Sequence, residues 1–247
     1  MWFRRSAALL LACVAILASV QCGRGLFRQY EYEEEIYLKL DGSADIVVNT
    51  SIPALAALRG AKLDTRPETP VNRDAVRAFY ESAGVQVTRV SRPWRRHGRR
   101  FVQIRIETDD IRELGRAAPF AWSTYEFKER DGQLVYVQKI GSPAGVQVPD
   151  AGWDGSELIA VRMHVPSRIQ YHNSSSREVQ RGNILAWEQP LADRLAGKPL
   201  EIEVRMETES ILARTLTIFG LSAGAALALL AAIVLWVRRQ GRAQAAS

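Results

Sequence analysis

Length, charge and cysteine content limit what this chain can be. It has 247 residues and a formal net charge of +6, from 33 Lys and Arg against 27 Asp and Glu. All 27 acidic residues lie between Gly23 and Ser210 together with 27 of the basic ones, so that interval is formally neutral. The basic excess lies towards the chain ends and gives no support to a nucleic-acid-binding domain. Both cysteines, Cys13 and Cys22, precede the interval, which excludes a disulfide framework or a cysteine-based metal site within it.

Residues 1–22 have the pattern of an export signal. Arg4 and Arg5 are followed by apolar or small residues from Ser6 to Val20, as in the charged and apolar regions of a secretory signal. This stretch is shorter than the roughly 20 residues that a membrane-spanning helix needs. Cys22 stands where bacterial lipoproteins carry their lipid-modified cysteine, although the residues before it differ from the usual lipobox. Cys22 is therefore either a lipid-attachment site or an ordinary residue of the signal or of an uncleaved anchor.

Residues 23–210 predict a single domain of α+β class, an antiparallel β-sheet with a few short helices. Short runs alternate apolar and polar residues, as half-buried strands do, and Asp-Gly pairs at 41–42 and 131–132 mark hairpin turns. The predicted strands are Tyr30–Leu40, Ala44–Ser51, Val85–Val90, Phe101–Glu107, Trp122–Lys128, Leu134–Ile140, Glu157–Val165, Asn183–Trp187 and Leu200–Glu207. Short helices are predicted at Ala54–Ala61, at Arg73–Ser82 behind the N-cap Asn72, from Asp109 or Asp110 to Leu114, and at Leu191–Leu195. Ser142–Gly155, rich in Gly and Pro, is predicted as the longest loop.

An arginine cluster around one tryptophan marks the predicted connection between the strands at 85–90 and 101–107. Arginine binds phosphate with a planar fork, and tryptophan favours the membrane interface. We therefore regard this connection as a candidate contact for an anionic surface. The alternative is a solvated turn whose tryptophan packs on the sheet edge. The candidate residues are Arg92, Trp94, Arg95, Arg96, Arg99 and Arg100.

The sequence contains no familiar motif for catalysis or metal binding. His97, His164 and His172 lack the spacing of a zinc motif, and there is no nucleophile elbow or phosphate-binding glycine loop. The acidic run within residues 31–35 is interpreted as a solvated strand edge that discourages further pairing, not as an acid–base pair. We therefore expect no catalytic residue, no metal and no cofactor.

The segment from Thr215 to Val237 predicts a transmembrane helix. Its 23 residues carry no charge, and as a helix they reach about 34 Å, enough to cross the hydrocarbon core. Trp236 lies at its margin, and Arg238 and Arg239 follow directly. By the positive-inside rule, residues 238–247 form a short cytoplasmic tail and the α+β domain lies outside the cytoplasm.

Small residues recur every four positions along this predicted helix. They form one face, as in helix–helix packing motifs, which suits a partner helix or a homodimer. The alternative is an alanine-rich helix that shows the pattern by chance. The residues are Gly220, Gly224, Ala228 and Ala232.

Segments near both ends of the predicted domain are similar to a known family. They are Val161–Pro166 and Asn183–Glu188 near its end, and Cys22 with Leu38–Ala44 near its start. These segments resemble the LppM-like domain of mycobacterial membrane-anchored lipoproteins, except that Ser167 stands where Gly would be expected. The resemblance implies an extracytoplasmic α+β domain that contacts envelope lipids or glycolipids, and it supplies no catalytic residues.

The sequence therefore predicts a membrane-tethered, extracytoplasmic binding or scaffolding domain of the bacterial cell envelope. Its expected partners are the membrane, an envelope lipid or glycolipid, and a partner helix or second copy, with no nucleic acid. The alternative is a cell-envelope enzyme with a dispersed site. Clustering of His164, His172 and carboxylates in a cleft would favour the enzyme, whereas a pocket without converging titratable groups would favour the binding domain.

Overall fold

The computed structural model of the chain describes residues 28–244, in which the strands form two sheets. The larger sheet has the order β10-β8-β1-β2-β5-β3, with β4 paired to β5, and the smaller has the order β6-β7-β11-β9. The strands are β1 Tyr30–Leu38, β2 Ala44–Ser51, β3 Val85–Val90, β4 Trp94–Arg96, β5 Arg99–Thr108, β6 Ser123–Arg130, β7 Gln133–Ile140, β8 Leu158–His164, β9 Ser167–His172, β10 Ile184–Pro190 and β11 Leu200–Ser210. Together with a few short helices and one long apolar helix, this confirms the predicted α+β class.

The two Asp-Gly hairpins form as predicted, since β1 pairs with β2 and β6 pairs with β7, both antiparallel. The larger sheet is not wholly antiparallel, because β1 also pairs with β8 in parallel, from Tyr30 opposite Leu158 to Tyr37 opposite His164. This parallel pairing joins segments more than 120 residues apart in the chain. It places β1 between two neighbours, in the interior of the sheet.

Strand β9 was not predicted from the sequence. It lies at the edge of the smaller sheet beside β11 and is mostly half-buried or exposed. Its pairing with β11 shifts register between Arg205 and Met206 and again before Ser210. An irregular edge strand of this kind lacks the buried alternating face by which strands are recognised in a sequence.

The hydrophobic core lies between the two sheets. The larger sheet contributes Ile36, Ile104 and Trp187, and the smaller contributes Val204 and Met206, all within one buried cluster. Each side chain belongs to the inward-facing set of its strand, which follows from the period-two alternation of strand residues. The two inner faces therefore pack as one continuous core.

Short helices pack against this core. They are α2 Ile52–Arg59, α3 Arg73–Tyr80, α4 Leu191–Leu195 and the 3-10 turns η2 Ile111–Arg116 and η3 Ala118–Phe120. Every residue of α2 is buried. Ser51 caps its first turn by accepting a hydrogen bond from Ala54 N, and Gly60 ends the helix with a left-handed φ of 74°. Asn72 caps α3 as predicted, accepting from Asp74 N and Ala75 N.

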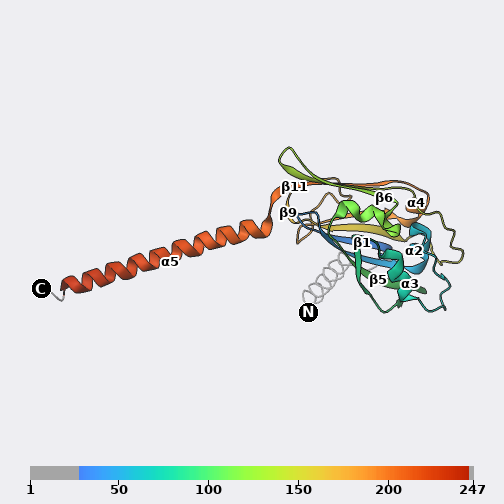
Figure 1. The fold of residues 1–247 in the computed structure, drawn as a ribbon, viewed down its shortest axis with the longest axis horizontal. Coiled ribbons are helices and arrows are strands. Elements are labelled where there is room, and N and C mark those ends of the chain that lie inside the picture. Colours follow the sequence, from blue (N-terminus) through green and yellow to red (C-terminus); the bar gives the residue numbers. More distant parts are fainter. Residues whose placement is uncertain (1–27, 245–247) are drawn as a thin grey trace, which may run out of the picture.

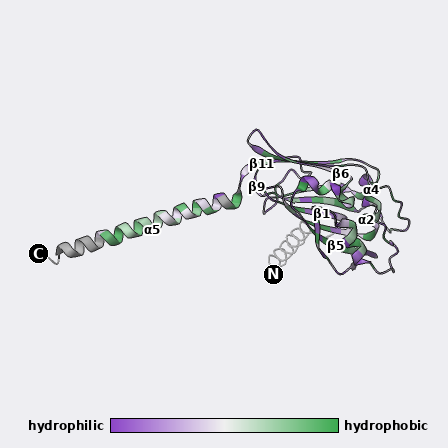
Figure 2. Cartoon of the chain, viewed as in Figure 1, coloured by the Kyte–Doolittle hydropathy of each residue, from purple (hydrophilic) through white to green (hydrophobic). Residues whose placement is uncertain are grey.

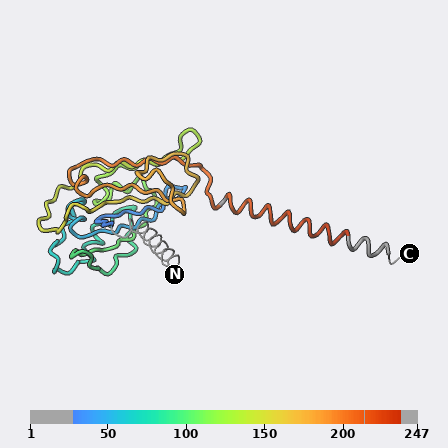
Figure 3. Tube along the Cα trace, turned by 180° about the vertical axis from the view of Figure 1, so that it is seen from behind, coloured from blue at the N-terminus to red at the C-terminus, as the bar shows by residue number. Residues whose placement is uncertain are grey.

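A single long helix, α5 Ile211–Gln244, leaves the domain directly from the end of β11. It extends away as an isolated rod in Figure 1 and, from behind, in Figure 3. Its segment Arg214–Trp236 is long and apolar enough to cross a membrane, and none of it is buried against the domain. Between its first turns and the turns drawn in grey, it is mostly coloured white to green in Figure 2. These features fit attachment of the domain to a membrane.

The domain thus has two ends, to which we refer as the anchor end and the far end. At the anchor end, Ser210 is followed by α5, and Ile211 N donates to Pro166 O at 3.3 Å, just beyond His164 at the end of β8. The strand pairings place Leu38 and Thr108 at this same end. The far end carries α2 and α4, as Figure 1 shows.

Candidate functional site

An open groove lies on the outer face of the larger sheet, near the anchor end. Its volume is about 410 Å³. Cross-strand pairing places Tyr37 beside Asp45, and Asp45 beside Glu107, in one row across β1, β2 and β5. Arg105 follows in the next row towards the far end, opposite Val47. The residues that line this anchor-end groove are Tyr37, Asp45, Ile46, Val47, Thr88, Arg105, Ile106 and Glu107.

Tyr37 forms the aromatic surface of the groove. Its ring stacks on His164 with centroids 3.9 Å apart and an interplanar angle of 16°. His164 Nε2 in turn lies 2.6 Å from Glu35 Oε1, which holds the imidazole in place. Burial raises the pKa of the Tyr37 phenol, and the charge of Glu35 raises it further, so the hydroxyl stays protonated at neutral pH. The side chain nevertheless remains 37% exposed.

Among the residues that the structure describes, the charged side chains of the groove around this ring have no strong ion-pair partners. Within residues 28–244, neither Arg105 nor Glu107 has an ion-pair partner. Asp45 Oδ2 lies 3.2 Å from Lys39 Nζ, but both side chains are about half exposed, so this pair is weak. The groove therefore offers carboxylates that accept hydrogen bonds and a guanidinium that donates them, next to one aromatic ring.

The acidic run on β1 is not a solvated edge, and that interpretation of the sequence is wrong. Since β1 lies between β8 and β2, its residues face either the core or the outer face of the sheet. Glu31 and Glu34 are fully buried. Glu33 pairs with Arg162, and Glu35 with His164, on the outer face.

Two of the candidate arginines are structural. Arg99 and Arg100 are each only 5% exposed. Arg99 Nε lies 2.9 Å from Glu31 Oε1, and Arg99 Nη2 lies 3.4 Å from Glu157 Oε1. Arg100 donates to the backbone carbonyls of Asp64 and Thr69. Burial therefore removes Arg99 and Arg100 from the predicted contact with an anionic surface.

The remaining candidates stay at the surface but at the far end. Arg92 is exposed, and Trp94, 39% exposed, stacks on Phe101 with centroids 5.8 Å apart. Arg95 donates to Pro67 O at 2.8 Å, and Arg96 donates to Arg28 O at 3.0 Å. This hairpin lies where β5 begins, whereas α5 leaves the domain near where β5 ends, about 30 Å away at strand geometry. It therefore faces away from the start of α5.

The two histidines of the enzyme alternative do not share a cleft. His164 lies at the anchor end of the larger sheet, whereas His172 lies on β9 of the smaller sheet, opposite Val204. His172 Nδ1 accepts from both the hydroxyl and the backbone N of Ser174, two residues on, which is a local turn contact. Among the described residues, no group of three His, Cys, Asp or Glu side chains is placed to hold a metal ion.

The other predicted sites are not tested by these contacts. Cys22 and the rest of the predicted export signal lie outside the described residues. The small-residue face of α5 is exposed, and a Cβ added at Gly220 or Gly224 would meet no atom within 4 Å. Helix pairing through Gly220, Gly224, Ala228 and Ala232 therefore stays a prediction.

The anchor-end groove was missed because its residues are ordinary one by one. Tyr37, Asp45 and Glu107 each occupy an outward-facing position of a predicted strand, where polar and aromatic residues are common. Their convergence depends on the register of β1 with β2 and of β2 with β5. The short Asp41-Gly42 turn was the one local signal for the first of these registers.

Comparisons with known proteins give one weak structural match. No family model matches the chain, and no curated protein sequence matches it. A solved structure, the folded domain of the Mycobacterium tuberculosis LppM protein, is similar at 13% sequence identity and a TM-score of 0.40. The match covers 73% of this chain and 92% of that one. This is a weak structural similarity to an LppM-like fold.

Proposed function

We propose that the chain is a membrane-tethered binding domain of the bacterial cell envelope whose anchor-end groove takes the hydroxyl-rich headgroup of a glycolipid. The position of the groove carries the proposal. His164, which supports the Tyr37 ring, lies two residues before Pro166, and Pro166 O accepts a hydrogen bond from the first residue of α5. A headgroup at the surface of the anchoring membrane would therefore meet this face of the sheet first.

The chemistry of the groove supports a sugar or another polyol. Hydroxyl groups both donate and accept hydrogen bonds, so one ligand can satisfy the Asp45 and Glu107 carboxylates and the Arg105 guanidinium together. The exposed part of the Tyr37 ring offers an apolar surface for the carbon–hydrogen face of a sugar ring. A groove with both charge signs does not favour a simple anion over a neutral ligand.

The test is titration calorimetry with the full-length chain in phosphatidylcholine nanodiscs. The probe is a short-chain diglucosyl glycerolipid, and the reference is a short-chain phosphatidylcholine without sugar. We expect heat of binding from the glycolipid alone. Tyr37→Ala and Arg105→Ala should each weaken binding roughly tenfold, because each removes one contact worth about 1 to 2 kcal/mol.

Arg89→Ala is the matched control. Arg89 is exposed on β3 directly opposite Arg105, but it does not line the groove. Its removal changes the net charge as Arg105→Ala does and should leave the affinity unchanged. Equal heats from both lipids, or an equal loss of affinity from Arg89→Ala, would contradict the proposal.

A further inference from the structure

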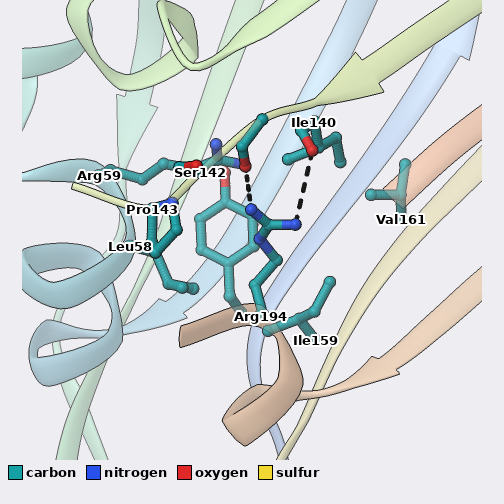
Figure 4. A pocket seen from close by; sticks show the side chains of 10 residues that line it. Leu58, Arg59, Ile140, Ser142, Pro143, Ile159, Val161 and Arg194 are labelled. Carbon is teal, nitrogen blue, oxygen red and sulfur yellow. Dashed lines mark hydrogen bonds between the residues drawn. The ribbon is translucent and has the colours of Figure 1, made fainter. Parts of the chain in front are cut away.

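A small cavity lies at the far end, between the two sheets and beside α2 and α4. Arg59 from α2 and Arg194 from α4 both reach it, as Figure 4 shows, and its walls include Tyr32, Ile140 and Ile159. Its volume of about 10 Å³ is close to the space that a single water molecule requires. This cavity is separate from the anchor-end groove and plays no part in the proposed function.

Arg59 enters the cavity with incomplete pairing. It is the last residue of α2, and it is 6% exposed. Its nearest carboxylate is that of Glu34, with 3.6 Å between Nη2 and Oε2, and its guanidinium lies 4.8 Å from the centre of the Tyr32 ring. Its Nε is buried and has no hydrogen-bond partner. A buried donor without a partner is unfavourable and marks room for a further acceptor.

Arg194 has no carboxylate partner in the described part of the chain. It is 3% exposed, and its guanidinium donates to backbone carbonyls of Ile140, Gly141 and Lys198. Carbonyls satisfy its hydrogen bonds but not its charge. Burial lowers the pKa of Arg194, and the positive charge of Arg59 lowers it further, so the two cations are close enough to repel.

The charges around the cavity do not balance. Two buried guanidinium groups face one buried carboxylate, that of Glu34, which also accepts hydrogen bonds from Tyr32 and Gln138. Uncompensated charge in an apolar interior is costly, and protein interiors normally provide a counter-charge. A water molecule in the cavity would occupy the space but would leave the extra positive charge.

We infer that this cavity binds one monatomic anion of the chloride class between Arg59 and Arg194. The volume suits an ion only slightly larger than water and is too small for phosphate, sulfate or an organic acid. The ion supplies an acceptor for Arg59 and the negative charge that Arg194 lacks. It thereby ties α2 and α4 to the turn at Gly141, which follows β7.

Thermal unfolding of the full-length chain in non-ionic detergent tests this inference. The melting temperature is measured in sodium chloride, bromide, phosphate and gluconate at equal ionic strength. Chloride and bromide should raise it by about 3 to 5 °C per tenfold rise in concentration above the dissociation constant, because a ligand bound only to the folded state stabilises it by mass action. Gluconate should not, and phosphate should give only the non-saturating rise that follows from its exclusion from protein surfaces. Equal behaviour of all four salts would show general screening and overturn the inference.

Variants separate this cavity from other cationic sites. Arg194→Met keeps an unbranched apolar stem but removes the guanidinium and its charge, and it should abolish the difference between chloride and gluconate. Arg112→Met is the control, because Arg112 is 57% exposed and already paired with Asp110, and it should keep the full difference. Retention of the chloride effect in Arg194→Met would contradict the inference.

Anomalous scattering gives a readout on the unmodified protein. Crystals of the full-length chain grown with bromide in place of chloride should show an anomalous peak between the guanidinium groups of Arg59 and Arg194. This measurement does not depend on the folding of any variant. A cavity without bromide, or with ordered water alone, would rule out the anion.

Discussion

Glu34 is a fully buried carboxylate on β1 that links the two sheets. Its Oε2 accepts from Tyr32 Oη at 3.0 Å, and its Oε1 accepts from Gln138 Nε2, on the smaller sheet, at 3.3 Å. Gln138 Oε1 in turn accepts from Tyr136 Oη at 2.9 Å. Burial raises the pKa values of both Tyr32 and Tyr136, so these phenols remain protonated donors across the physiological range. The network fixes how the two inner faces meet.

Glu34→Gln tests how much this hydrogen-bond network contributes to the stability of the domain. The change keeps the shape of the side chain but leaves Arg59 as a buried cation without its carboxylate. We expect the free energy of unfolding to fall by about 3 kcal/mol, the scale for breaking one side of a buried ion pair. Chemical denaturation followed by tryptophan fluorescence measures it.

The control for this prediction is Glu201→Gln, at an exposed pair with Lys139 in which both side chains are about 60% exposed. Exposed pairs contribute little, so this variant should unfold almost as the unmodified chain does. If the two variants lose the same stability, the buried network adds nothing beyond an ordinary surface contact.

Helix α2 stands out among the elements because all eight of its residues are buried. The helix ends abruptly at Gly60, which adopts a left-handed φ of 74°. The backbone N–H of Gly60 donates a hydrogen bond to Ala56 O. A Cβ added at Gly60 would lie 3.2 Å from Ala144 Cβ, in the loop after β7. Ala144 N also donates to Leu58 O. The helix end and the loop therefore fit one another closely.

Gly60→Ala and Gly84→Ala make a matched pair that tests this fit. Both residues have a left-handed φ, 74° and 78°, but a Cβ at Gly84 would meet nothing within 4 Å. Each substitution should cost about 1 kcal/mol from backbone strain. Gly60→Ala should cost about 1 kcal/mol more, because the loop at Ala144 must move. Equal losses in denaturant unfolding would show that the close contact has no energetic effect.

The elements that sequence patterns predicted well are the ones specified by neighbouring residues. Both Asp-Gly hairpins, the Asn72 cap and the turn at Leu191–Leu195 follow from residues within a few positions of one another. The predicted helix Ala54–Ala61 begins two residues earlier, at Ile52, because Ser51 rather than a later residue provides the cap. Local chemistry determines such features, so one sequence is enough to find them.

Features that depend on distant pairing could not be predicted in this way. Glu31 and Glu34 are buried because β1 pairs in parallel with β8, and no residue near position 31 predicts this pairing. The same holds for Arg99, whose partners Glu31 and Glu157 come from segments far away in the chain. The anchor-end groove requires the registers of three strands at once. Burial of charge and assembly of a surface site are properties of the tertiary structure.

At the scale of the whole molecule, orientation in the membrane is the open prediction. Arginines at 238, 239 and 242 favour a cytoplasmic C-terminus and an α+β domain outside. A reporter that is active only outside the cytoplasm should be active when fused after Ser210 and silent when fused after Ser247. The reversed pattern would place the domain in the cytoplasm and would also refute the proposed envelope function.

The direct junction between β11 and α5 has a mechanical consequence. Any pull on the membrane helix enters the domain at Ser210 and runs along β11, which is paired on both sides, with β7 and β9. Antiparallel hydrogen bonds lie perpendicular to their strands. Such a load therefore shears many bonds together instead of opening them one after another, as happens when an edge hairpin is peeled. The domain is attached to its anchor through a strand that resists extraction.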